Sequence, residues 1–412
     1  MTRFQELPNP QRRALELVRD VATEKDCRPF LVGGPVRDIL LGRHALDVDL
    51  TLEEGSSTLA GAVAKKIHGR LRSYPQFLTY KITAEGLPEI DIATARKEKY
   101  RKPGALPAVA PGRLKDDLIR RDFSINAIAM DLMTDALHDP TGGEKDLEKR
   151  LVRILHERSF IDDPTRIYRA LRLARRLGFT LEAGTERLMA EAIDNGALAT
   201  ISRERIWREL FLAMDEDYAP DVLADLNERG AIQSLLGVRA DARATASLAD
   251  IREQVAQHPD LDRYVLYTGA LLRGSEASPE QLEGSGFSQK RSKTVLQIAR
   301  DLSRIEEALD HASSERQRFR LYRSVAPEVL TAVVADRPDE APHVQRYEEY
   351  KKFKLPLRGN DLEMPGGPHV AKALERTREA VWTGEIPAEQ ARSFAREMAM
   401  KYLNREQPPE QK

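Results

Sequence analysis

The sequence predicts an α+β protein in which a small head of mixed strands and helices precedes an all-helical remainder. Two observations lead to this prediction. Residues 31–52, LVGGPVRDILLGRHALDVDLTL, pass from an apolar run through a Gly pair and a short helical pattern to an alternating run, which is typical of strand, turn, helix and strand. From residue 220 to 330 the apolar residues recur at helical spacing. A chain of 412 residues is long enough for about two to four domains.

The composition excludes several classes of protein. Hydrophobic residues make up 41% and charged residues 32%, and no apolar run approaches the ~18 residues of a membrane span. The single cysteine, Cys27, argues against a disulfide framework and a cysteine-rich metal site. The first residues contain no apolar signal core, so a cytoplasmic protein is expected. The net charge of -1 means that any affinity for RNA must come from local basic patches.

In the head, further elements are expected around residues 31–52. The apolar spacing predicts helices over 10–24 and 57–70 and strands over 76–84 and 89–94. Gly33 and Gly34 allow a tight turn and let backbone N–H groups approach an anion. Pro35 suits a helix start. A helix that begins behind a Gly pair therefore predicts a phosphate site.

Three carboxylates are candidates for catalysis. Asp47 and Asp49 alternate with apolar residues, so they share one face of a strand while Leu46, Val48 and Leu50 take the other. Two neighbouring carboxylates repel each other, and a cation such as Mg²⁺ removes that cost while it also binds substrate phosphates. Asp91 alternates in the same way within Glu89–Ala93. It is either a third acid beside the pair or a polar residue that points outward.

Residues 33–49 together match the pattern GG-x-V-R-D-x-L-L-G-R-x-x-x-D-x-D. This pattern resembles the head signature of class II nucleotidyltransferases, which include the tRNA CCA-adding enzymes and the bacterial poly(A) polymerases. The resemblance implies a polymerase-beta-like head in which Asp47 and Asp49 bind catalytic Mg²⁺. It also implies that Gly34 and Arg37 contact the incoming nucleotide and that Asp91 is the third acid.

The following segment is rich in proline, glycine and basic residues. Residues 96–114 lack helical periodicity and are predicted to form a loop. From Arg96 to Arg121 there are nine Lys/Arg against three Asp/Glu, as in a solvated charged loop or in a basic loop near triphosphate or RNA phosphates. In the family that it resembles, the segment is a flexible loop that helps to select the nucleotide.

Residues 120–127, RRDFSINA, resemble the second motif of the same family. An Arg-Arg-Asp run alone is more often a surface cluster. Here the apolar alternation of residues 123–129 favours a strand or another buried element. The resemblance implies that Arg121 binds phosphate and that Asp122 and Asn126 lie near the sugar hydroxyls, where they would favour ribonucleotides.

A charged helix is predicted over 144–158, and a second helix within the stretch 159–179 is predicted to end at Gly178. In the second helix Arg166, Arg169 and Arg172 recur every three residues, as in a solvated face or a stripe that needs anionic partners. The run Asp162-Asp163-Pro164 is either an ordinary capped helix start or a version of the family's base-reading motif, E-D-x-x-R. The motif implies that Asp163 accepts from the exocyclic amine of A or C and that Arg166 donates to the ring. Arg169 and Arg172 would lie further along the nucleotide.

In one position the motif departs from the family, because Asp162 stands where the family has Glu. This departure bears on the switch from C to A. Beyond the motif, Ser202 is a plausible N-cap of a helix over 201–214. The segment from 357 to 386 resembles the tail of CCA-adding enzymes and should be helical after Pro368.

The resemblance completes the domain prediction: a catalytic head over 1–143, a base-reading neck over 144–215, a helical body over 216–330 and a tRNA-binding tail over 331–412. The expected reaction is untemplated nucleotidyl transfer from ATP, with CTP as the expected second substrate, to the 3′ end of a tRNA. Full CCA addition and addition of the terminal A alone both stay open. A poly(A) polymerase and a non-catalytic RNA-binding protein are the alternatives, and neither DNA nor a membrane is an expected partner.

Overall fold

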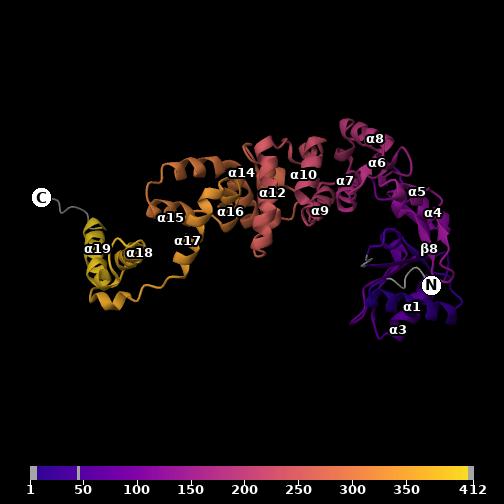
Figure 1. Ribbon diagram of the computed structural model, residues 1–412, viewed down its shortest axis with the longest axis horizontal. Coiled ribbons are helices and arrows are strands. Elements are labelled where there is room, and N and C mark those ends of the chain that lie inside the picture. The colour runs from indigo at the N-terminus through magenta and orange to yellow at the C-terminus, as the bar shows by residue number, and fades with distance from the viewer. Residues whose placement is uncertain (1–6, 44–46, 407–412) are drawn as a thin grey trace. The chain divides into compact units, whose positions relative to one another are not determined.

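The computed structural model describes residues 7–43 and 47–406, and its chain forms two compact units (Figure 1). The first unit comprises Met1–Arg239 and Gln281–Gly286, and the second comprises Ala240–Glu280 and Phe287–Lys412. The finer division into head, neck, body and tail stays a prediction.

The first unit contains a mixed sheet. In the described part of the chain, seven strands follow one another in the order β3-β4-β5-β2-β1-β8-β9. β2 and β5 pair in parallel and the other neighbours are antiparallel. The strands are β1 Phe30–Val32, β2 Val48–Leu52, β3 Arg70–Tyr74, β4 Thr79–Thr83, β5 Ile90–Thr94, β8 Ala129–Asp131 and β9 Leu137–His138.

The two faces of this sheet are covered differently. Helices α1 (Asn9–Glu24) and α3 (Ser56–Lys66) pack against each other and against strands of the sheet, on the face to which Leu31 and Leu50 point. Phe30 and Val32 point to the other face, where they form a buried cluster with residues of α4 (Leu114–Ile119). Asp49 shares this second face because it alternates with Leu50, which pairs with Leu31. The candidate site therefore lies on the face that carries α4.

The pattern of residues 31–52 is confirmed as strand, turn, helix and strand. β1 leads through Gly33 into α2 (Gly34–Leu40), and β2 follows. Leu46, which was expected on the apolar face, lies outside the described residues. The helices predicted over 10–24 and 57–70 are α1 and α3, and β5 matches the strand predicted over 89–94. The strand predicted over 76–84 begins only at Thr79, because Pro75–Phe77 forms a 3₁₀ turn.

The prediction of a loop over 96–114 is wrong in part. β6 (Arg96–Lys99) and β7 (Ala108–Pro111) form an antiparallel hairpin, so that only residues 100–107 and 112–113 of the predicted loop lie in no helix or strand. The backbone N–H of Gly112 donates to the carbonyl of Ala95 at 2.8 Å and closes the base of the hairpin. A two-stranded ribbon tolerates the prolines at its ends because each strand has an unpaired edge.

The helix predicted over 144–158 is also too long. α5 (Gly143–Glu148) ends before Arg150, whose φ of 55° breaks the helix, and β10 (Leu151–Val152) then pairs in parallel with β11 (Thr180–Leu181). Upstream, the segment 123–129 contains a 3₁₀ turn over Ser124–Asn126 and only then enters β8. It is a buried element rather than a strand throughout.

The rest of the chain is helical, as predicted. Gly178, with a φ of 69°, ends α7 as expected. The remaining helices of the first unit are α6 Ser159–Asp162, α7 Thr165–Leu177, α8 Ala183–Asp194, α9 Arg203–Met214, α10 Ala219–Glu228 and α11 Ala231–Leu236. Those of the second unit are α12 Ala242–Gln257, α13 Arg263–Leu271, α14 Gln289–Asp310, α15 Glu315–Arg323, α16 Pro327–Asp336, α17 Ala341–Lys352, α18 Pro368–Trp382 and α19 Ala391–Glu406.

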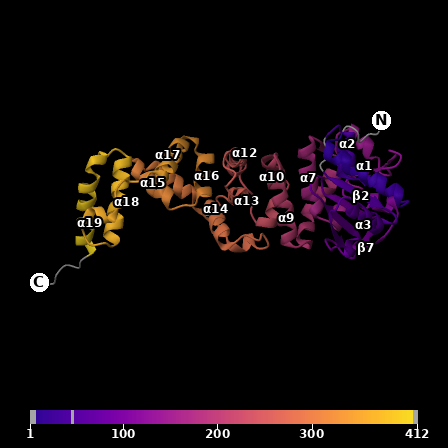
Figure 2. The same cartoon turned by 90° about the horizontal axis from the view of Figure 1, so that it is seen from below.

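In the second unit, α18 and α19 lie side by side in both views (Figures 1 and 2). Leu362, Val370 and Ala395 form a small core there, so the helix expected after Pro368 is confirmed. No helix in the described ranges has the length and apolar character needed to cross a membrane.

A close contact at the start of α5 generates the first prediction. A Cβ added to Gly143 would lie 2.8 Å from the carbonyl carbon of Ser124 and 2.9 Å from the side chain of Ile128. We therefore expect Gly143→Ala to lower the free energy of unfolding by about 1–3 kcal/mol, because the 3₁₀ turn that carries Asn126 must shift. Chemical denaturation measures this change.

Gly61→Ala is the matched control. Gly61 lies within α3 and has nothing within 4 Å of the added Cβ. Alanine should be neutral there, or stabilise the helix by up to about 1 kcal/mol. Equal effects of the two substitutions would contradict the packing argument at Gly143.

Candidate active site

The turn between β1 and α2 brings a backbone bend next to two arginines. Gly33 has a backbone φ of 77°, which residues other than glycine rarely adopt. A Cβ at this position would also lie 2.7 Å from the guanidinium of Arg121. Arg37, from the first turns of α2, is buried. Because α2 has only seven residues, the two guanidinium groups rather than the helix dipole would supply most of the attraction for an anion.

The predicted carboxylates come together on β2 and β5. Asp49 and Asp91 are directly paired in the parallel register, so their side chains are neighbours on one face. Burial, followed by the charges of Asp91 and Asp47, raises the pKa of Asp49 to about 6. Burial also raises the pKa of Asp91, although Lys81 at 3.5 Å opposes this. Asp47 is exposed and lies just before β2.

These carboxylates fit a divalent cation. Oδ1 of Asp91 is buried and has no hydrogen-bond partner in the described part of the molecule, and burial together with the charges of Asp91 and Asp47 disfavours the ionised form of Asp49, which a nearby cation would favour. The described residues contain no cluster of three or more ligands spaced to hold a metal by themselves. Mg²⁺ does not require one, because it is usually held by one or two carboxylates together with substrate phosphates.

The two arginines that precede Asp122 are held by a carboxylate that the sequence analysis did not single out. Asp117, on α4, is 1% exposed and accepts from Arg120 at 2.6 Å and from Arg121 at 2.9 Å. Burial would raise the pKa of Asp117, but the charges of Arg121 and Arg120 keep it below its usual value. In the sequence, the spacing of three and four residues from Asp117 to Arg120 and Arg121 could have predicted these ion pairs on a helix.

Four of the predicted residues form one hydrogen-bonded chain across the site. Arg37 donates to the side-chain oxygen of Asn126 at 2.7 Å, and Asn126 donates to Asp122 at 3.1 Å. Asp122 also accepts from Nε of Arg169 at 3.0 Å. Burial would raise the pKa of Asp122, but Arg169 and Asn126 lower it to about 2. Residues from α2, the 3₁₀ turn and α7 are thereby fixed relative to one another.

Asp163 and Arg166 lie together at the start of α7, and the contacts of Asp163 include those of a helix cap. Oδ1 of Asp163 accepts from the N–H of Thr165 at 3.2 Å and from its hydroxyl at 2.6 Å, as a helix cap does. The same oxygen accepts from Arg205 of α9 at 2.9 Å. Arg166 is buried and donates to the hydroxyl of Ser159 at 2.6 Å and to the carbonyl of Arg120 at 3.0 Å. Arg205 is a further residue that sequence reasoning missed, because nothing local to residue 205 indicates a contact with residue 163.

The arginines along α7 have anionic partners within the protein. Arg172 lies 3.4 Å from Glu209 and 3.6 Å from Glu216. Arg175 pairs with Asp225 at 2.6 Å, and Arg176 pairs with Glu216. The expectation that this stripe needs anions is therefore met largely by carboxylates of α9, α10 and the turn between them.

Two adjoining cavities of the first unit contain the predicted residues. One of about 470 Å³ extends from Gly33 past Arg121 to Asp163 and Arg166. The other, of about 560 Å³, extends from Arg37 past Asp47 to Arg172 and Arg176. Both are lined by Gly34, Asp49, Asp122, Asn126 and Arg169. All the predicted residues except Asp91 line one or both cavities, and Asp91 lies beside Asp49 at their margin.

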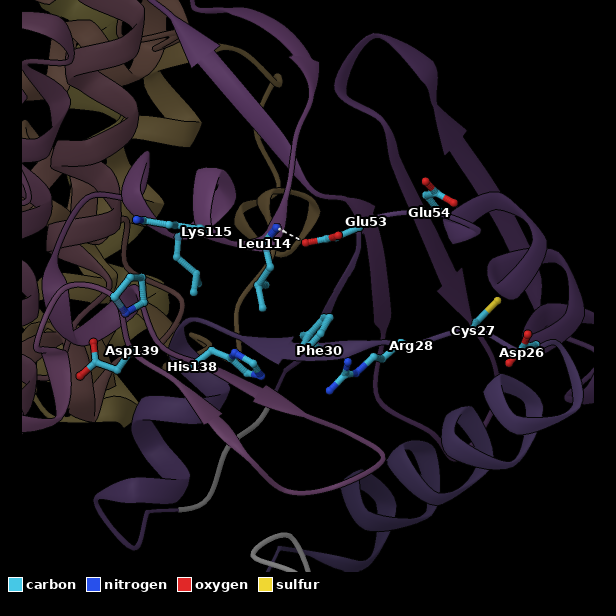
Figure 3. A pocket seen from close by; sticks show the side chains of 12 residues that line it. Asp26, Cys27, Arg28, Phe30, Glu53, Glu54, Leu114, Lys115, His138 and Asp139 are labelled. Atoms are coloured by element: carbon cyan, nitrogen blue, oxygen red, sulfur yellow. Dashed lines mark hydrogen bonds between the residues drawn. The ribbon is translucent and has the colours of Figure 1, made fainter.

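A third cavity, of about 680 Å³, lies elsewhere in the head (Figure 3). Its wall includes Phe30, Leu114 and His138, and the N–H of Leu114 donates to Glu53 at 2.8 Å. It contains none of the predicted site residues, and acidic and basic side chains are mixed along it. Size alone therefore does not identify the candidate site, which is indicated instead by the partly buried carboxylates Asp49 and Asp91.

Comparisons with known proteins agree with this geometry. Residues 29–153 match the family model of the poly A polymerase head domain. The A-adding tRNA nucleotidyltransferase of Aquifex aeolicus is 33% identical over 80% of this chain and 41% of its own length. The corresponding protein of Geobacter sulfurreducens is 30% identical over 92% of this chain and 46% of its own. The chain thus spans about half the length of these two relatives.

The chain covers a larger share of some other similar proteins. The multifunctional CCA protein of Pseudomonas fluorescens is 32% identical over 72% of this chain and 69% of its own length. A solved structure described as a tRNA-processing enzyme complex is 30% identical, with a TM-score of 0.71 over 92% of this chain and all of that one. A CCA-adding enzyme solved with ATP has a TM-score of 0.81 at 23% identity, which supports the fold.

The sheet with its paired carboxylates, followed by helices, defines a polymerase-beta-like nucleotidyltransferase fold of the α+β class. The chain belongs to the class II tRNA nucleotidyltransferase family. That family suggests dependence on a divalent metal.

The pairing of Asp122 with Arg169 generates a prediction of pH dependence. The pKa of Asp122 falls from 3.8 to about 2 on folding, so the ion pair stabilises the fold at neutral pH and is lost as the pH falls from about 5 towards 2. We expect Asp122→Asn to lower the free energy of unfolding by about 2 kcal/mol at pH 7. Asparagine keeps an acceptor for Asn126 but carries no charge.

Denaturant titrations at pH 7 and pH 3 measure this difference. It should shrink at pH 3, where the wild-type pair is weakened. Asp194→Asn, at an exposed position of α8, is the control and should change the stability little at either pH. A loss that stays the same at both pH values would show that packing rather than charge causes it.

Proposed function

We propose that the protein transfers a nucleotidyl group from ATP to the 3′ end of a tRNA and releases pyrophosphate. The observation that carries the proposal is the partly buried pair Asp49 and Asp91 at the margin of a cavity whose far end holds Asp163 and Arg166. The relatives from Aquifex aeolicus and Geobacter sulfurreducens are named A-adding enzymes, which favours addition of a single A to a tRNA that ends in C-C. Full CCA addition, with CTP as a second substrate, is the first alternative.

The proposed metal is Mg²⁺, and Asp47 and Asp49 would hold it together with the phosphates of the substrate. When bound, it supplies positive charge to the transferred phosphate and to the leaving pyrophosphate. Asp91 lies beside Asp49 on the neighbouring strand, where its carboxylate would accept a hydrogen bond from the attacking 3′-hydroxyl. Asp49, whose pKa is about 6 in the metal-free protein, would stay ionised at neutral pH.

The phosphates and the sugar would be held by the residues that the two cavities share. Gly33 and Gly34 leave room for phosphate oxygens beside the guanidinium groups of Arg121 and Arg37. Asp117 and Asn126 fix these two guanidinium groups in advance, so little side-chain freedom is lost on binding.

A ribose would lie against Asp122 and Asn126, and the arginines of α7 would follow the nucleotide. Asp122 and Asn126 offer polar groups to the sugar hydroxyls. Arg169 lines both cavities, whereas Arg172 lines the cavity that extends away from Asp163. These arginines would hold the nucleotide between the base and the carboxylates.

The base would be selected by Asp163 and Arg166. Within the described residues, the hydrogen bonds of the Asp163 side chain all use Oδ1, so Oδ2 remains to accept from the exocyclic amine of A or C. Arg166 uses two of its five N–H groups and has others for a ring acceptor. G and U present the opposite pattern, and a mispaired polar group in a closed site costs about 1–3 kcal/mol.

A test of the function uses three RNAs: a tRNA ending in C-C, a tRNA ending before the first C, and an unstructured RNA. With ATP and Mg²⁺, we expect one A on the first tRNA and little addition to the unstructured RNA. Chelation of the metal, or Asp49→Asn, should lower incorporation at least about 100-fold, because charge stabilisation of several kcal/mol is lost.

Each other outcome has a defined meaning. Addition of C-C-A to the second tRNA when CTP is also present would establish full CCA addition. A ladder of adenylates on the unstructured RNA would establish a poly(A) polymerase. No incorporation into any of the three would support the non-catalytic RNA-binding alternative and overturn the proposal.

A further prediction concerns the choice of the base. Asp163→Ala should lower the preference for ATP over GTP about tenfold or more, because the acceptor of the amine is lost. Thr165→Val is the matched control, since it removes the hydroxyl that donates to Asp163 but leaves the carboxylate of Asp163 in place. Competition assays with mixed nucleotides measure the preference. If both variants lose stability and neither changes the preference, Asp163 is only a helix cap.

A further inference from the structure

A row of charged residues crosses the outer half of the sheet. Arg72 of β3 pairs with Lys81 of β4, Lys81 pairs with Asp91 of β5, and Asp91 pairs with Asp49 of β2. Residues in register on neighbouring strands share a face, so these four side chains form one line on the face of the candidate site. Three strand spacings of about 4.8 Å separate the first backbone from the last by roughly 14 Å.

The outer end of this row is basic and open. All five residues of β3 are exposed, and no ion pair is recorded for Arg72 in the part of the chain that the structure describes. Lys81 is 31% exposed and bonds to Glu89 as well as lying near Asp91. Tyr74 and Phe77, at the end of the β3–β4 hairpin, are 36% and 47% exposed. This surface therefore offers cations and aromatic rings together.

The two cavities of the site lie on the other side of the carboxylates. Within the described residues, neither cavity is lined by a residue of β3, β4 or β5. They contain the groups suited to phosphate, sugar and base. An in-line displacement requires the attacking oxygen to approach opposite the leaving group. A nucleotide in these cavities would thus leave the side of Asp91 and Lys81 to the attacking hydroxyl.

We propose that the single-stranded 3′ end of the RNA acceptor crosses β4 and β3, with its last phosphates on Lys81 and Arg72. This inference rests on the proposed function and deepens it. The charges are complementary, because phosphodiesters are anionic and the row becomes basic away from Asp91. Phosphate contacts set the register of a nucleic acid without reading its sequence, and Tyr74 provides a surface on which a base can stack.

The test measures binding separately from turnover. The probe is a 5′-labelled RNA hairpin with a single-stranded 3′ overhang ending in C-C, and the variant is Arg72→Ala. We expect the Kd for this RNA to rise about three- to tenfold. The slope of log K against log salt should fall by about 0.7, the contribution of one phosphate contact in a single strand. The KM for ATP should not change.

Two controls make the result specific. Lys65→Ala removes an exposed charge from α3 on the opposite face of the sheet and should leave RNA binding unchanged. A blunt hairpin without the overhang should bind the Arg72→Ala variant as well as it binds the wild type. Arg72→Glu should weaken binding of the overhang further, and thermal unfolding of both variants shows that the fold is intact.

The outcomes separate this inference from the proposed function. Unchanged binding of the overhang, an equal loss for the blunt hairpin, or an increase in the KM for ATP would each overturn the inference. The proposed function fails instead if the wild-type protein binds the overhang in an Arg72-dependent manner but incorporates no nucleotide.

Discussion

The central constraint on the head is the placement of Asp49 and Asp91 side by side on neighbouring strands. Parallel pairing of β2 and β5 makes these two carboxylates neighbours in a partly buried position. Such a pair is stable only if a proton or a cation neutralises part of its charge. Lys81 supplies some compensation from one side, and the raised pKa of Asp49 shows that it is not enough. The fold therefore maintains an unmet demand for positive charge at one point of the sheet, as a site for a metal and a polyphosphate requires.

A second constraint is that the arginines around this point must be held before any ligand arrives. An unpaired guanidinium in a partly buried site is costly, so each arginine has a carboxylate or carbonyl partner. Asp117 holds Arg121, and Asp122 holds Arg169. Because the partners come from α4 and from the turn after it, the arginines stand in defined positions at the cavity walls. Binding an anion then requires little reorganisation.

Local pattern was enough to predict part of this site. The alternation of Asp47 and Asp49 and the glycine turn before α2 are encoded by near neighbours, so they could be predicted from the sequence. The register of Asp91 against Asp49 follows from pairing of distant strands, which alternation alone does not specify. The hairpin of β6 and β7 was missed because prolines concealed a ribbon closed by the Gly112–Ala95 hydrogen bond. The contact of Arg205 with Asp163 joins residues 42 positions apart and has no local signal.

The same reasoning explains how one face of the sheet could serve the two substrates that we propose. Antiparallel and parallel registers place Asp49, Asp91, Lys81 and Arg72 at successive positions of one line. The acidic half of the line adjoins the two cavities of the candidate site, and the basic half faces solvent. A nucleotide and an RNA end both carry phosphates, so charge alone would not keep them apart. The carboxylate pair would keep the two ligands apart, because it repels phosphate oxygens unless a cation lies between them. The boundary between the two anions is therefore the position that the proposed metal ion would occupy.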